Sequence, residues 1–189
     1  MIAYYDIGHK LLYSGFSEKP YARYSVNPAF RPEYAFSVEK INGEYYVISN
    51  IFSEYYWYAL VENRQGSVKL HSKKTEINEE LYLKIRELFE ILIAQTKEKE
   101  RIFKVGPNGE LYEIVEFGAD GETYTFSITD KNGEVKSGKT WSPHPSNKPI
   151  LSRLIKICDD LWNIENSISQ TNILKEIEIL ICDIQRNVD

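Results

Sequence analysis

The chain has 189 residues, of which 42% are hydrophobic and 27% are charged, and this balance is typical of a folded protein rather than a disordered one. Its length suits one ordinary domain or two small modules that share a core. The formal net charge of −5 argues against nucleic acid as a partner, because proteins that bind it neutralise phosphates with surplus lysine and arginine. An acidic protein would more naturally meet a basic partner, although such a charge is also ordinary surface chemistry for solubility.

Residues 1–35 are rich in aromatic side chains, and we expect them to form an arm that packs on the rest of the protein. The segment lacks the basic start, apolar run and cleavage site of a signal peptide. No stretch of the chain approaches the ~20 consecutive apolar residues of a membrane span. We therefore expect a cytoplasmic protein with no membrane partner. The large side chains of the arm are Tyr4, Tyr5, Leu11, Leu12, Tyr13, Phe16, Tyr21, Tyr24 and Phe30.

Residues 36–100 and 101–168 are predicted to be two copies of one unit. The sequence from Ile41 can be laid on the sequence from Pro107, since both copies begin with Asn-Gly-Glu and later contain Gly-x-Val-Lys and then Lys-Thr. Self-similarity in a fixed order indicates a duplicated supersecondary unit. We therefore predict an α+β fold of two tandem antiparallel β-meander-plus-helix units, packed pseudo-symmetrically, with an extra C-terminal helix in residues 169–189.

Within the units, turns and strands are marked by local signals. Residues 122–129 alternate between apolar and hydroxyl side chains, which predicts a strand with one face on the core and the other in water. Asn and Gly tolerate the positive φ angles that tight hairpins need. Hairpin turns are accordingly predicted at Asn42-Gly43, Asn108-Gly109, Asp120-Gly121 and Asn132-Gly133.

Three helices follow from apolar residues at helical spacing. The first is capped by Asn78 and carries the stripe Leu81, Ile85, Leu88, Phe89 and Leu92. The second begins near Pro149 and buries Leu151, Leu154, Ile155, Cys158, Leu161 and Trp162. The third begins at about Asn172 and carries Ile173, Leu174, Ile177, Leu180, Ile181 and Ile184.

The two cysteines, Cys158 and Cys182, both fall in these apolar helical patterns. Two buried reduced thiols are expected, in keeping with a cytosolic protein. A disulfide between them stays open as an alternative if the last two helices form an antiparallel hairpin. The three histidines are scattered and no CxxC pair occurs, so no metal site is predicted.

Four residues, Gly133, Gly138, Lys139 and Thr140, match the phosphate-loop pattern G-x-x-x-x-G-K-[ST]. A true phosphate loop joins a buried strand to a helix, whose N-terminus faces the phosphate. Here Asn132-Gly133 indicates a hairpin instead, and three prolines follow Thr140 where a helix should begin. We interpret the match as accidental and predict no bound cofactor.

The two units differ on one face of a predicted strand. Trp57, Ala59 and Val61 align with core-facing positions of unit two, which leaves Tyr56, Tyr58 and Leu60 on the opposite face. Unit two has hydroxyl residues there. Either the N-terminal arm covers this apolar face, or the face is a recognition surface. The candidate binding surface is Tyr56, Tyr58 and Leu60, with Trp141 and His144 from the proline-rich loop.

No nucleophile and base stand out as a catalytic pair, so we expect a non-enzymatic protein-binding module. An inhibitor or immunity-type protein that caps a basic partner would fit the size and the acidic balance. The alternative is a small-molecule or nucleotide-binding protein that uses the groove between the units and the loop 133–145. Self-association through the C-terminal helix is a further possibility.

Overall fold

A computed structural model describes residues 2–96, 103–105, 111–113, 121–143, 145–146 and 148–186. For residues 2–6, 103–105 and 111–113 it describes the backbone alone. The described helices are α1 (Ile2–Leu12), α2 (Tyr56–Val61), α3 (Glu79–Gln95), α4 (Pro149–Trp162) and α5 (Ser167–Arg186), with a 3-10 turn at Gln65–Ser67. The described strands are β1 (Ala22–Pro28), β2 (Tyr34–Ile41), β3 (Glu44–Phe52), β4 (Leu70–Ile77), β5 (Phe103–Val105), β6 (Leu111–Glu113), β7 (Glu122–Thr129) and β8 (Val135–Trp141).

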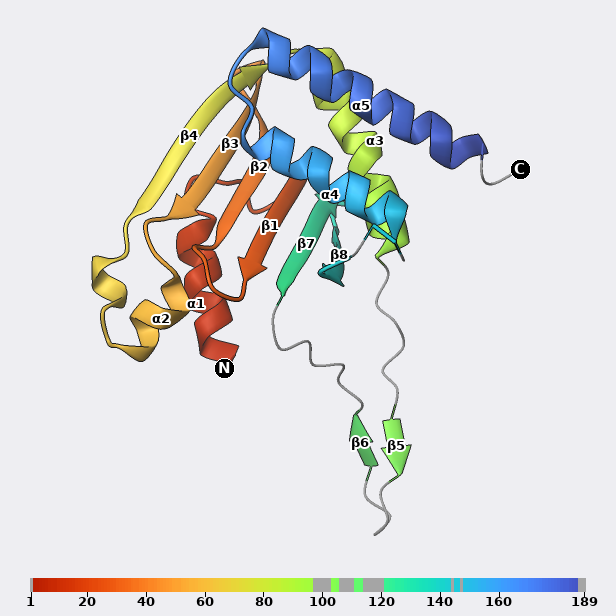
Figure 1. Cartoon of the computed structure of the whole chain (residues 1–189). Coiled ribbons are helices and arrows are strands. Elements are labelled where there is room, and N and C mark those ends of the chain that lie inside the picture. Colours follow the sequence, from red (N-terminus) through yellow and green to blue (C-terminus); the bar gives the residue numbers. More distant parts are fainter. Residues whose placement is uncertain are drawn as a thin grey trace.

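Six strands form one antiparallel sheet in the order β4-β3-β2-β1-β7-β8, and β5 pairs with β6 in a separate hairpin (Figure 1). The α+β prediction is confirmed. The predicted turn at Asn42-Gly43 joins β2 to β3, with φ angles of 54° and 95°. Asn132-Gly133 lies in the turn from β7 to β8, where Gly133 has a φ of 81°. The predicted turn Asn108-Gly109 lies outside the described residues, as does Asp120.

The main core lies between one face of the sheet and the helices α3, α4 and α5 (Figure 1). The Asn78 side chain accepts a hydrogen bond from the backbone N–H of Leu81, as predicted for a helix cap. All five residues of the predicted α3 stripe are buried, and so are Leu151, Leu154, Ile155, Cys158 and Leu161 of α4. The C-terminal helix is confirmed, although it begins at Ser167 rather than near Asn172. None of the described helices combines the length and apolar character needed to cross a membrane.

The N-terminal residues take two different places in the fold. Helix α1 lies on the other face of the sheet, where a second apolar cluster forms from Leu12, Ala35, Phe52 and Tyr56. Strand β1, in contrast, enters the centre of the sheet between β2 and β7, and its Tyr24 is fully buried. Phe30 is 75% exposed. Part of the arm, helix α1, therefore covers some of the second face, and another part, strand β1, belongs to the core. The side chains of Tyr4 and Tyr5 lie outside the described part of the structure.

The predicted strand over residues 56–61 is wrong, because these residues form the short helix α2. Tyr56 and Ala59 are its buried residues, and this spacing of three is helical. The aligned residues 123–128 are in strand β7, so the two matched segments differ in structure. The pseudo-symmetric repeat is consequently not confirmed. What the two halves do share is a strand followed by a core helix, β4-α3 and β8-α4.

The two cysteines are both free, and the structure contains no disulfide between them. Cys158 is buried in α4, as expected. The expected burial of Cys182 is wrong, because this thiol lies on the exposed side of α5.

Gly138 lets the end of α3 approach strand β8 closely. A Cβ atom added there would lie 1.9 Å from Thr96 Oγ1 and 3.2 Å from Ile93 Cα. We therefore expect Gly138→Ala to lower the free energy of unfolding by about 1–3 kcal/mol, as overpacking does in cores. Chemical denaturation measures this change. Gly66→Ala is the control, since a Cβ there meets nothing within 4 Å, and equal stability of the two variants would contradict the prediction.

Candidate functional site

Hydroxyl and lysine side chains line the second face of the sheet over β7 and β8, which we call the open face. Thr123, Thr125 and Ser127 of β7 pair in register with Trp141, Lys139 and Ser137 of β8. The β8 side chains are exposed and the β7 side chains are half-buried. Helix α1 packs chiefly on β3, away from these strands. The open face is therefore accessible to a ligand.

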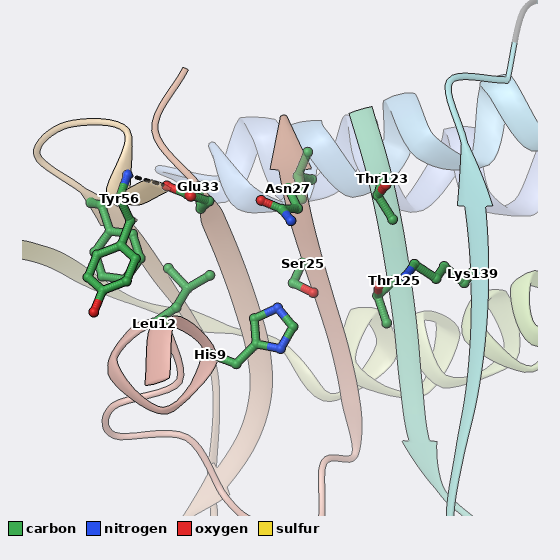
Figure 2. Close-up of a pocket in the computed structure, with 12 residues that line it drawn as sticks. His9, Leu12, Ser25, Asn27, Glu33, Tyr56, Thr123, Thr125 and Lys139 are labelled. Carbon is green, nitrogen blue, oxygen red and sulfur yellow. Dashed lines mark hydrogen bonds between the residues drawn. The ribbon is translucent and has the colours of Figure 1, made fainter. Parts of the chain in front are cut away.

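A pocket lies where α1 borders the open face, with an empty volume of about 470 Å³ that includes its mouth. Its side chains come from α1, β1, β7 and β8, from the segment before β2, and from the end of β3 and the start of α2 (Figure 2). One end is apolar and the other polar. The apolar end contains Leu12, Phe52 and Tyr56, and the polar end contains His9, Ser25, Asn27, Thr123, Thr125 and Lys139.

The apolar end is held by contacts of Tyr56. Its backbone N–H donates to the buried carboxylate of Glu33 at 2.9 Å, which also satisfies a free amide at the start of α2. Its ring stacks on Phe52 with centroids 5.1 Å apart. Gly8 of α1 lies against the same ring, since a Cβ there would be 3.3 Å from Tyr56 Cδ1. This wall of the pocket is thus preformed.

At the polar end, Tyr13 fixes two neighbours. His9 stacks on its ring at 5.3 Å, and the Tyr13 hydroxyl donates to Ser25 Oγ at 3.0 Å. Burial raises the pKa of the Tyr13 phenol, so this hydroxyl stays a donor at neutral pH. Ser25 Oγ accepts that bond and retains its own proton to donate.

Lys139 extends from β8 toward β7, and its ammonium ends beside Thr125 (Figure 2). Within the described part of the chain it forms no ion pair. An ammonium group has three donors and no acceptor. Lys139 therefore adds a donor-only group to a pocket end whose hydroxyl side chains can either donate or accept.

The predicted binding residues do not form one surface. Tyr56 is only 2% exposed and lines the pocket, whereas Tyr58 is 59% exposed. Because successive helical residues turn by about 100°, side chains two apart point to different sides of α2. Leu60 is half-buried. Trp141 is 47% exposed on the open face, and His144 lies outside the described residues.

The phosphate-loop match forms a turn and a strand. Gly133 lies in the hairpin turn, and Gly138, Lys139 and Thr140 lie inside β8. Gly138 faces Thr96 of the α3 end, and Thr140 is buried. The predicted hairpin is confirmed, and the strand-loop-helix geometry of a phosphate cradle is not formed by these residues. Lys139 nevertheless lines the pocket through its place on β8.

The sequence analysis missed a half-buried carboxyl on the core face, that of Asp159. Asp159 Oδ1 accepts hydrogen bonds from the hydroxyls of Tyr24, at 2.9 Å, and Tyr34, at 2.8 Å. Burial raises the pKa of the Asp159 carboxyl, although both hydrogen bonds oppose the shift. Burial, with the charge of Asp159 second, also raises the pKa of Tyr24 and of Tyr34. An Asp beside Cys158 within the apolar pattern of α4 was the available sequence signal.

This cluster continues toward the surface through charged residues. Glu122 of β7 accepts from Arg31 Nε at 2.6 Å and from the Tyr124 hydroxyl. The Arg31 guanidinium also lies 5.1 Å from the centroid of the Tyr34 ring. These bonds tie the loop between β1 and β2 to β7, so we interpret the cluster as structural. No group of three or more His, Cys, Asp or Glu suited to a metal ion occurs among the described residues.

Asp159→Asn tests how ionisation of this half-buried carboxyl affects the free energy of unfolding. The raised folded-state pKa means that the contribution of Asp159 to stability is complete below the unfolded value of about 3.9 and is lost as pH rises through the folded value. The Asn carbonyl can still accept both tyrosine bonds without titrating. Relative to Asp159→Asn, the wild type should therefore be less stable at pH 7 than at pH 4 in denaturant unfolding.

Asp160→Asn is the matched control, because the neighbouring carboxylate faces Lys156 at the surface at 2.7 Å. A stability difference between wild type and Asp159→Asn that is the same at both pH values would contradict the prediction.

Comparisons with models of protein families, with curated proteins and with solved structures find no match for this chain. Three features of the described residues could contact a ligand or partner: the pocket, the open face with Trp141, and the exposed side of α2 with Tyr58.

Proposed function

We propose that this chain is a non-enzymatic binding protein that docks another protein on the open face of its sheet. The observation that carries the proposal is Trp141, a large aromatic side chain that is 47% exposed on a face left largely uncovered by α1. Tryptophan and tyrosine supply much of the binding energy at protein interfaces, because they bring a large area at a small cost in conformational entropy.

A second exposed aromatic group supports the same proposal. The rings of Tyr55 and Tyr58 lie 6.2 Å apart along α2, and Val61 follows one turn later at 63% exposure. Such a ridge adds apolar area beyond the pocket wall that Tyr56 forms. The net charge of −5 favours a basic partner, as an inhibitor or immunity-type protein would have, and this part of the proposal depends on the charge alone.

The pocket chemistry favours binding over catalysis. Ser25 is the buried hydroxyl of the pocket, and its hydrogen-bond partner is Tyr13 rather than a base such as His9. A phenol whose pKa is raised by burial does not take a proton from serine at neutral pH. The arrangement orients a donor for a ligand and does not activate a nucleophile.

A second candidate function is small-molecule binding in the pocket. The specific observation in its favour is that Lys139, from the loop and strand region 133–145, contributes to the pocket an ammonium that forms no ion pair with any residue that the structure describes.

An affinity pull-down of the tagged protein, with bound proteins identified by mass spectrometry, tests the main proposal. We expect Trp141→Ala and Tyr58→Ala each to lower recovery of a stoichiometric partner about tenfold or more, as loss of an interface hot spot does. Tyr56 is unsuitable for this test, because its buried ring supports the fold.

Leu83→Ala is the control for surface truncation, since Leu83 is 56% exposed on α3, which packs on the opposite face of the sheet. Recovery that falls equally with Leu83→Ala, or that is unchanged with both aromatic variants, would reject the open face and α2 as the docking surface.

A further inference from the structure

We propose that the polar end of the pocket is a recognition site for a single carboxylate group, with Lys139, Thr125 and Ser25 as its principal donors. The inference deepens the second candidate function and does not require the docking of a partner on Trp141. It concerns the ligand class that the pocket accepts, which the shape of the pocket alone does not specify.

Several side chains can donate hydrogen bonds into the polar end of the pocket. Lys139 offers an ammonium, and Thr125, Thr123 and Ser25 offer hydroxyl protons into the same space. Lys139 and Thr125 are directly opposite each other in the β7–β8 register. The ammonium and the hydroxyl can therefore both bind the same polar group of a ligand. The Lys139 ammonium can only donate, and the hydroxyls beside it can either donate or accept, so an anion is the group that can pair with all of them. Hydrogen bonds to an ionised group are also the stronger kind.

Two acceptor groups of the pocket, on Glu33 and Ser25, already have partners within the fold. Glu33 is the carboxylate among the pocket residues, and it is at the apolar end, where the backbone N–H of Tyr56 donates to it. Tyr13 already donates to Ser25 Oγ, which leaves the Ser25 proton directed elsewhere. Glu33 and Ser25 thus each accept a hydrogen bond within the fold, whereas Lys139 forms no ion pair with the residues that the structure describes.

The charge of the site favours a carboxylate over a phosphate. The single ammonium of Lys139 balances one negative charge, whereas a phosphate dianion would bring a second charge toward Glu33, which is 5% exposed. The flat carboxylate group also suits donors on two adjacent strands, and the apolar end with Leu12 and Phe52 would contact the carbon chain of the ligand. A carboxylate of this kind belongs either to a free small acid or to a glutamate side chain of a partner.

Titrations followed by ¹H–¹⁵N NMR spectra of the full chain, at constant ionic strength and pH 7, test this inference. The probes are acetate against acetamide, and the capped tripeptide acetyl-Gly-Glu-Gly-amide against its Gln counterpart. We expect saturable shifts of the Thr125 and Lys139 amides with at least one carboxylate and no saturation with either amide. Saturation by acetate alone assigns a free acid, and tighter saturation by the Glu peptide assigns a partner side chain.

Two variants make the result specific to the pocket. Lys139→Gln keeps a side chain of similar length without the charge and should weaken binding at least about tenfold, and Thr125→Val should weaken it about threefold or more. Lys131→Gln is the matched control, because it removes the same charge from the exposed turn of the same hairpin. Retention of dispersed spectra shows that each variant is folded.

The inference is overturned if neither carboxylate saturates the wild type, if the amides shift the same resonances equally, or if Lys139→Gln binds as tightly as Lys131→Gln. Because no partner protein enters these titrations, capture of a partner together with no carboxylate binding would overturn this inference alone.

Discussion

Every other part of the sheet depends on strand β1, because its two edges are bonded to strands from opposite halves of the sequence. One edge pairs with β2 and continues into the meander β2-β3-β4, and the other pairs with β7 and continues into β8. Tyr24, at the middle of β1, is fully buried, and its ring contacts Tyr34, Phe36, Tyr124 and Phe126. Without this strand the N-terminal meander and the C-terminal hairpin would share no backbone hydrogen bonds within the sheet.

The pocket also depends on the pairing of β1 with β7. Ser25 and Asn27 alternate along β1 with the buried Tyr24 and Val26, so the strand presents polar side chains to the second face. There they meet the threonines of β7, while α1 packs over β3, two strands away from β1, and places His9 beside them. A polar hollow forms because the covering helix ends short of β7. The polar character of the site therefore results from the alternation of side chains along β1 and β7, and from the fact that α1 does not extend over β7.

The sequence predicted those parts of the fold in which local signals and burial agree. The Asn78 cap with its apolar stripe and the alternation of residues 122–129 both carry a complete periodic signal, and both were confirmed. The structure of residues 56–61 could not be predicted in this way, because a continuous apolar run has no periodicity that separates a strand from a helix. The start of this helix is also bonded to Glu33, which is distant in the sequence. Lys139 was singled out for a pattern that has no structural basis here, and its true setting follows from the non-local pairing of β1 with β7.

That pairing also has a consequence for how the chain acquires its structure. Tyr24 pairs with Phe126, so β1 lacks its partner until the ribosome has released β7, a delay on the order of ten seconds at ordinary rates of synthesis. During this time the meander exposes one edge of β1 and the hydrophobic face that α4 and α5 later cover. Pairings so distant in sequence slow folding, since the chain must close a long loop before any contact compensates for the lost entropy. The nascent protein therefore passes through a stage at which a bare strand edge is open to association with other chains or to capture by chaperones.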